Sequence, residues 1–135
     1  MVDRYLFRGK RIDTGEWIVG SLLVDKQQDI DTGEQIEITG IYPSEYKDFA
    51  KKIDPSTICQ CTGRKDKNGK LIYENDIMVA YYDEENPVMV VWRECGFVAV
   101  ENNSDELCPL DYFTQKHFYV VGNIFDNPEL LEVQL

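Results

Sequence analysis

The four cysteines are the side chains whose type and spacing raise the question of a zinc site. Cys59 and Cys61 stand two residues apart on a predicted strand, so both side chains point to the same face. Cys95 and Cys108 lie thirteen residues apart in predicted turns. A four-thiolate zinc site usually has two C-x-x-C pairs, because each pair turns two sulfurs onto one ion. We therefore expect packed thiols, and neither a metal ion nor a cofactor.

Nucleophilic and phosphate chemistry also lack their usual patterns. His117 is the only histidine and precedes the apolar run 118–121, a position typical of a structural or surface residue. No serine lies in a Gly-x-Ser-x-Gly elbow. Five residues separate Gly63 from Gly69, and the run does not end in Gly-Lys-Ser/Thr, so it forms no phosphate-binding loop. We predict that the protein is not an enzyme; an enzyme that these motifs do not reveal stays open as an alternative.

Charge is unevenly distributed along the chain, with 14 basic against 25 acidic residues and a net charge of −11. Residues 51–75 carry six basic and three acidic side chains, whereas residues 76–135 carry two and twelve. Because proteins bind duplex DNA largely by neutralising phosphates, this balance disfavours nucleic acid. The basic segment Lys51–Lys70 keeps nucleic-acid association as an alternative, with Arg64, Lys65 and Lys67 as its candidate contacts.

The acidic C-terminal half suggests a different partner. Asp83, Glu84 and Glu85 lie in a predicted turn over residues 83–87, and we take them as candidate contacts to a basic protein. Solvated charge that only aids solubility is the alternative. Aromatic residues make up 12% of the chain and could form a stacking platform for single-stranded nucleic acid, but in a small β domain they more often pack in the core.

The elements that must position these residues are short strands joined by tight turns. Turn sequences at 13–16 and 31–34 separate predicted strands over 4–11, 17–24 and 36–41. Asn68-Gly69 is a strong hairpin signal because both central residues favour positive φ. Further strands are predicted over the following segments: 58–62, 77–82, 88–92, 97–100 and 117–124.

Two helices are predicted beside these strands. Over 44–53, Tyr46, Phe49, Ala50 and Ile53 fall at helical spacing and form one apolar stripe. Asn127 and Pro128 begin a short C-terminal helix. The sequence therefore predicts a mainly β fold, a small barrel or pseudo-barrel of short antiparallel strands with one flanking helix and a short C-terminal helix. An α+β fold is the alternative.

No composition shift, linker, internal repeat or low-complexity segment interrupts the chain, so a single domain over residues 1–135 is expected. No apolar run approaches the ~20 residues of a membrane span. Residues 1–8 contain no apolar signal-peptide stretch. We therefore expect a cytoplasmic protein that does not associate with membranes.

Residues 61–77 resemble the hallmark segment of the YopX family, which reads aromatic-Thr-Gly-x-x-Asp-Lys-Asn-Gly-x-x-Ile-Tyr-Glu-Gly-Asp-Ile. Residues 121–131 are similar to the closing motif of that family, and the opening segments 7–10 and 15–17 also fit. The chain departs from the family form at Cys61, where an aromatic residue is usual, and at Asn75, where glycine is usual. Asn75 is expected at positive φ, which asparagine tolerates. The run from Tyr73 also resembles the strand entry of SH3-like barrels, an analogy of fold that implies no function.

The resemblance implies a mostly β protein encoded by a bacterial phage or prophage, with no established activity and no catalytic residues to carry over. We therefore expect an accessory protein in the cytoplasm of a bacterial host. It would act by binding a host or phage protein, because binding needs only a surface. A purely structural or homo-oligomeric role stays open beside the nucleic-acid and enzyme alternatives.

Overall fold

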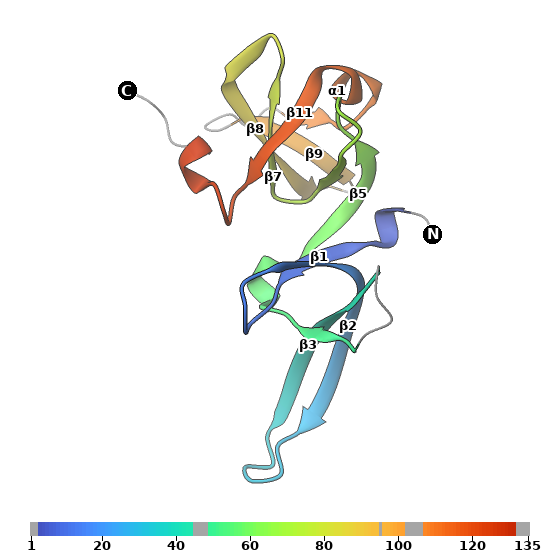
Figure 1. Ribbon diagram of the computed structural model, residues 1–135, viewed down its shortest axis with the longest axis vertical. Helices are drawn as coiled ribbons and strands as arrows, with labels where there is room; N and C mark the ends of the chain where they lie inside the picture. The colour runs from blue at the N-terminus through green and yellow to red at the C-terminus, as the bar shows by residue number, and fades with distance from the viewer. Residues whose placement is uncertain (1–2, 45–48, 95, 102–106, 132–135) are drawn as a thin grey trace. The chain divides into compact units, whose positions relative to one another are not determined.

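Strands dominate the computed structural model, which describes residues 3–44, 49–94, 96–101 and 107–131. The chain divides into two compact units, Met1–Gln60 and Cys61–Leu135 (Figure 1). The predicted mainly β fold is confirmed. Among the helices of the described ranges, none has the length and apolar character needed to cross a membrane.

The first unit is an antiparallel sheet with the strand order β4-β3-β2-β1. Its elements are η1 (Asp3–Tyr5), β1 (Phe7–Lys10), β2 (Trp17–Gln28), β3 (Gln35–Pro43), β4 (Lys51–Lys52) and η2 (Pro55–Thr57). The side chains of Ile41 and Ile53 are fully buried, and a Cβ at Gly9 would collide with Ile53. Glycine at this position lets β1 lie close to the core of the sheet.

Strand β5 (Cys59–Lys65) belongs to both units, because it starts in the first and ends in the second. Its first residues pair with β1, and its later residues pair with β6 (Leu71–Tyr73). The register shifts between Cys61 and Lys65, and Gly63 within this stretch has φ of +79°. Cys59 and Cys61 are both fully buried, as expected for packed thiols, whereas Cys108 is exposed, so the expectation is wrong there; Cys95 lies outside the described residues.

The second unit contains a five-stranded antiparallel sheet with the order β10-β9-β8-β7-β11. Its strands are β7 (Asp76–Ala80), β8 (Asp83–Arg93), β9 (Gly96–Glu101), β10 (Leu107–Pro109) and β11 (Phe118–Asn123). Ile72, Met78 and Val90 are buried at the centre of its core, with Leu110 and Ala99 beside them. Among the described strands, neither sheet closes into a barrel.

Two short helices flank this second sheet. Helix α1 (Tyr112–His117) begins at a capping box, in which the Asp111 carboxylate accepts the Thr114 amide and the Thr114 hydroxyl accepts the Asp111 amide. The predicted C-terminal helix is present as the 3-10 helix η3 (Pro128–Leu131). The Leu130 amide donates to the Asn127 carbonyl, so η3 follows the predicted start at Asn127.

The predicted helix over 44–53 is wrong in its described part. Residues 45–48, including Tyr46, lie outside the described residues, but Lys51–Lys52 form β4 and Ile53 pairs with Arg11 in an isolated bridge. Phe49 is 84% exposed while Ile53 is buried, so the two do not share one apolar face. The backbone pairing of β4 with β3 and of Ile53 with Arg11 therefore replaces the helix that the spacing of apolar residues predicted.

The two hairpin turns of the first unit repeat one sequence. Residues 12–16 and residues 30–34 both read Ile-Asp-Thr-Gly-Glu, which corrects, at this short length, the expectation of no internal repeat. Both turns close in the same way, because Gly15 and Gly33 have φ of +74° and +73° and each threonine hydroxyl accepts the amide two residues on. The repeated sequence therefore gives the same local structure twice.

Candidate functional site at the aromatic end of the second unit

Two tyrosines form the tight turn between β7 and β8. Ala80 pairs with Asp83, so Tyr81 and Tyr82 occupy the turn itself rather than the predicted strand over 77–82. The turn is fixed to the start of β11 because the Tyr81 amide donates to the His117 carbonyl at 3.0 Å. The predicted acidic turn over 83–87 is wrong for the same reason, since β8 already begins at Asp83.

The turn meets helix α1 in a group of four rings, Tyr81, Tyr82, Phe113 and His117, which we call the aromatic cluster. The His117 ring stacks on Tyr81 at a centroid distance of 5.7 Å and lies 4.3 Å from the Phe113 ring. Tyr81 and Tyr82 meet edge to face at 5.3 Å. Tyr81, Tyr82 and Phe113 remain 53%, 58% and 49% exposed, so much of their ring surface faces solvent.

His117 joins the other three rings of the cluster. Its Nδ1 atom is buried and has no hydrogen-bond partner among the described residues, while its ring contacts Tyr81, Tyr82 and Phe113. No group of three His, Cys, Asp or Glu side chains in the described part of the chain is placed to hold a metal ion. In this structure His117 therefore packs against the other three aromatic side chains of the cluster.

Charged side chains of both signs contact aromatic rings of the second unit. The Lys67 ammonium lies 5.3 Å from the centroid of the Tyr81 ring, within cation–π range. Glu84 accepts a hydrogen bond of 2.9 Å from the Tyr119 hydroxyl. This bond to a carboxylate, together with some desolvation and the negative charge of Glu84, raises the pKa of Tyr119. Asp83 accepts two hydrogen bonds from the Asn86 amide, at 2.9 and 3.1 Å.

The structure thus brings part of the predicted contact residues together. Lys67 reaches Tyr81 in the cluster. Glu84 reaches Tyr119, which is not one of its four rings, and no described ring or ion-pair contact links Arg64, Lys65 or Glu85 to the cluster. Arg64 and Lys65 are exposed at the end of β5. The basic segment Lys51–Lys70 is divided, since Lys51 and Lys52 lie in the first unit.

The sequence does not show which aromatic residues are buried in the core and which are exposed at the surface. Tyr73 is buried in the core, and Trp92 is exposed beside Phe97 at a ring distance of 4.9 Å. Phe113 lies on α1, a six-residue helix that was not expected because it is too short to show helical periodicity. Asp111 followed three residues later by Thr114 was the available signal for its start.

The hallmark segment 61–77 serves the framework beside this site. Asp66 is only 3% exposed, and its carboxylate accepts the amides of Asn68 and Lys70 on Oδ1 and of Val120 on Oδ2. This carboxylate therefore closes the β5–β6 hairpin and fastens it to β11. The Lys67 amide, which donates to the Phe118 carbonyl at 2.8 Å, makes a second link to β11.

The end of the same segment is framework as well. Asn75 has φ of +70°, which confirms the predicted left-handed conformation. Its amide donates to the Val90 carbonyl at 2.7 Å, and its carbonyl accepts the Ile124 amide at 3.1 Å. The buried carboxylate of Asp76 accepts the Tyr73 amide at 2.8 Å. These contacts tie β6 and β7 to β8 and to the end of β11.

The closing motif is also built from hydrogen bonds. Asn123 Oδ1 accepts the amides of Phe125 and Asp126, and the Asn127 side chain accepts the Asn123 amide at 3.2 Å. A Cβ at Gly122 would collide with this Asn127 side chain, so only glycine fits there without a shift. The two motifs of the sequence therefore hold the second unit together, while the aromatic cluster lies outside them.

Comparison with solved structures gives a match over nearly the whole chain. The crystal structure of protein EF1440 from Enterococcus faecalis aligns with a TM-score of 0.53 and 24% sequence identity, covering 93% of this chain and 96% of that chain. At this identity the similarity shows the fold. Among curated proteins, no relative of the chain was found.

The family comparison is consistent with both motifs. The family model described as YopX protein matches residues 6–132, which include the hallmark segment 61–77 and the closing motif 121–131. The match runs through both compact units and across strand β5 that they share. This chain therefore belongs to the YopX protein family.

Proposed function

We propose that this protein is a phage or prophage accessory protein that acts by binding another protein through the aromatic cluster and the neighbouring carboxylates of β8. The observation that carries the proposal is the exposure of Tyr81, Tyr82 and Phe113 at one turn and one helix. Tyrosine is enriched among the residues that dominate protein–protein binding energy, because its ring buries a large area at little entropic cost.

The geometry of the aromatic cluster favours specific binding of a protein partner over non-specific hydrophobic association. The turn is anchored by the Tyr81–His117 backbone hydrogen bond, and the rings brace one another, so little conformational freedom is lost when a partner covers them. Asp83 and Glu84 follow the turn directly, and Glu85 continues the acidic run. A partner with basic groups around an apolar patch would satisfy both features.

The first test immobilises the purified chain and identifies what it retains from host lysate, with and without nuclease. We expect a specific protein that survives nuclease and is lost with Tyr81→Ser or Phe113→Ser. Tyr5→Ser is the matched control, because Tyr5 is an equally exposed tyrosine of the first unit. Retention that is equal for all three variants would exclude the aromatic cluster as the contact.

Charge reversal separates the two predicted partner classes. Asp83→Lys, Glu84→Lys and Glu85→Lys together should abolish capture of a basic protein. If the ligand is nucleic acid instead, its retention should be abolished by the triple change Arg64→Glu, Lys65→Glu and Lys67→Glu. Nucleic-acid binding should also weaken steeply as the salt concentration rises. Loss of all retained material after nuclease treatment would favour the nucleic-acid alternative over protein binding.

A further inference from the structure

The β2–β3 hairpin of the first unit extends beyond the strands that flank it (Figure 1). β2 pairs with β1 only over Trp17–Gly20, and β3 pairs with β4 only at Gly40 and Ile41. Residues 23–38, which we call the arm, therefore form a ribbon in which the two strands pair only with each other. An isolated two-stranded ribbon is marginally stable in water, so an exposed one of this length needs a reason.

The two faces of the arm differ in chemistry. Register pairs Ile36 with Gln27, Ile38 with Asp25 and Gly40 with Leu23, and Tyr42 follows at its base. Side chains of directly opposed residues share a face, so one face carries Leu23, Ile36, Ile38 and Tyr42 together with the polar Asp25 and Gln27. The opposite face pairs Val24 with Thr39, Lys26 with Glu37 and Gln28 with Gln35, so Val24 is the one large apolar side chain of the arm on that face.

The apolar face is not covered by the described chain. Leu23, Ile36 and Tyr42 are 40%, 42% and 49% exposed. Strict alternation of apolar and polar residues, as in Gln35-Ile36-Glu37-Ile38-Thr39, is typical of a strand that buries one face. In the arm this alternation occurs although the apolar side chains remain largely exposed. We take an exposed apolar face of this kind as a surface for a partner.

The tip of the arm presents one more apolar side chain on a rigid turn. Ile30 is 99% exposed. Around it, Asp29 Oδ1 accepts the amides of Asp31 and Thr32, and the Gln28 side chain donates to the Gly33 carbonyl at 3.2 Å. A fixed loop that holds an apolar side chain in water loses little entropy on docking.

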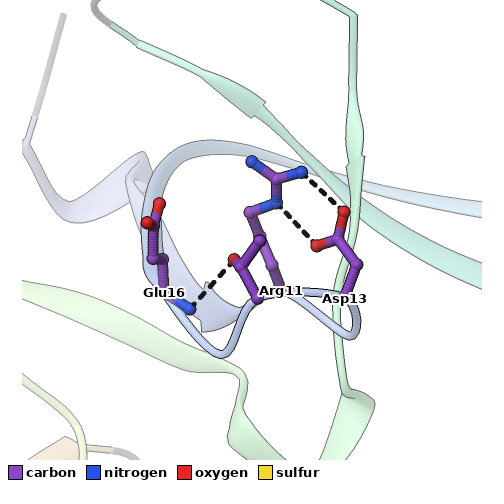
Figure 2. A network of polar contacts seen from close by, with 4 residues as sticks. Arg11, Asp13 and Glu16 are labelled. Atoms are coloured by element: carbon purple, nitrogen blue, oxygen red, sulfur yellow. Dashed lines mark hydrogen bonds and ion pairs between the residues drawn. The ribbon is translucent and has the colours of Figure 1, made fainter.

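The charge of the arm identifies the kind of partner. Residues 25–37 contain five acidic side chains and one lysine, a net charge of −4. The first turn shows that this charge is not needed to fold the repeated sequence. There Arg11 stands where Asp29 stands in the second turn, and it forms an ion pair of 2.7 Å with Asp13 (Figure 2). The same turn thus forms with one carboxylate paired to a cation, whereas residues 29–34 contain three acidic side chains and no basic one.

We propose that the arm is a docking element whose apolar face and Ile30 insert into an apolar surface rimmed by lysine and arginine on a partner protein. Complementary charge would steer the encounter and the apolar side chains would supply the affinity. A second copy of this chain fits less well, because its net charge of −11 opposes a negative arm. This site lies in the first unit and is independent of the aromatic cluster.

The experiment places a photo-crosslinking amino acid at position 36, and in a second variant at position 24, in host cells. Val24 is the matched control because it is exposed on the opposite face of the same ribbon, paired with Thr39. We expect position 36 to crosslink a basic protein and position 24 to crosslink it weakly. Crosslinks to the same chain, equal crosslinks from both positions, or none at all would overturn the proposal.

Affinity measurements with that purified protein complete the test. Ile36→Thr should weaken binding about tenfold, because it removes apolar area from the contact, whereas Val24→Thr should not change it. Asp29→Asn removes one charge, while its amide oxygen can still accept the Asp31 and Thr32 amides that hold the turn. It should weaken binding at low salt and lose this effect at high salt. Binding unchanged by Ile36→Thr would overturn the docking face.

Failure here can be told apart from failure of the proposed function. Tyr81→Ser and Phe113→Ser should leave the crosslink from position 36 in place, because they lie in the other unit. Loss of that crosslink in these variants would show that the arm does not act as a separate docking element.

Discussion

At the scale of single residues, two side chains have ionisation behaviour set by specific neighbours. Tyr119 donates its hydroxyl proton to Glu84, and this bond favours the neutral phenol. Cys108 is an exposed residue whose thiol is partly desolvated and feels the negative charges of Asp111 and Glu101. Burial first and the two carboxylates second disfavour the thiolate, so the pKa of Cys108 is raised. Both effects can be tested by neutralising one named carboxylate.

Glu84→Gln should lower the pKa of Tyr119 toward its ordinary value, because an amide accepts the hydrogen bond without the negative charge. The folded pKa lies above the unfolded one, so the bond stabilises the fold below the unfolded pKa, and this contribution is lost as pH rises through the folded pKa. NMR titration of the hydroxyl-bearing ring carbon measures the shift. Glu85→Gln is the control, and an equal shift in both variants would contradict a local cause.

Cys108 should react with iodoacetamide more slowly than a free thiol at mildly alkaline pH, because less of it is thiolate. Asp111→Asn should speed the reaction, since it removes one repelling charge while asparagine still caps α1. Peptide mass spectrometry resolves Cys108 from the other cysteines. A rate unchanged by Asp111→Asn would contradict a role for Asp111 and leave desolvation and Glu101 as the causes of the slow reaction.

At the scale of elements, one buried carboxylate joins the β5–β6 hairpin to β11. Asp66→Asn should destabilise the second unit by about 1–3 kcal/mol, because an amide that still serves Asn68 and Lys70 presents its NH₂ group to the Val120 amide. Urea unfolding measures the change. Asp83→Asn, an exposed change of the same chemistry, should have little effect; comparable losses in the two variants would contradict the assigned role of Asp66.

Local signals in the sequence predicted the elements that depend on local geometry. Gly69 and Asn75 have the predicted positive φ, because that conformation is a property of the residue and its turn, whereas Asn68 does not have positive φ although the β5–β6 hairpin forms. The C-terminal 3-10 helix begins where Asn127 and Pro128 indicated. The helix over 44–53 failed because pairing between β3 and β4 is a contact between distant residues, which spacing along the chain does not reveal.

The candidate site could be predicted only in part, for the same reason. Glu84 and Lys67 were named from charge alone; Lys67 contacts the Tyr81 ring of the aromatic cluster, and Glu84 contacts Tyr119 outside it. Tyr81 and Tyr82 have high strand propensity and were placed in a strand, but the register of β7 and β8 puts them in a turn. Phe113 joins them through tertiary packing of a helix too short to be recognised.

At the scale of the whole molecule, the boundary between the compact units falls inside β5, which explains why no linker or change of composition marks it. Each unit contains one of the two tryptophans, Trp17 in the first and Trp92 in the second. Replacing either one by phenylalanine leaves a fluorescent reporter for the other unit. The two units can therefore be followed separately during unfolding.

We expect Asp66→Asn to move the urea midpoint reported by Trp92 more than the midpoint reported by Trp17, because its hydrogen bonds lie within the second unit. Gly20→Ala should do the reverse, since a Cβ there would collide with the Tyr42 carbonyl in the first unit. Fluorescence of the Trp92→Phe and Trp17→Phe backgrounds makes the comparison. Equal shifts of both reporters for each variant would show that the chain unfolds as one cooperative body.

The duplicated Ile-Asp-Thr-Gly-Glu turn has a practical consequence for protein engineering. The same five residues occur in two settings and adopt one conformation. In both, the backbone of the preceding residue, Arg11 or Asp29, closes the bend, and the side chain at that position can differ. The apex isoleucine at position 30 is almost wholly in solvent, which leaves that position open to other side chains. The pentapeptide, with one residue before it, is therefore suited to grafting into other β-hairpins, where its apex position can display a chosen side chain.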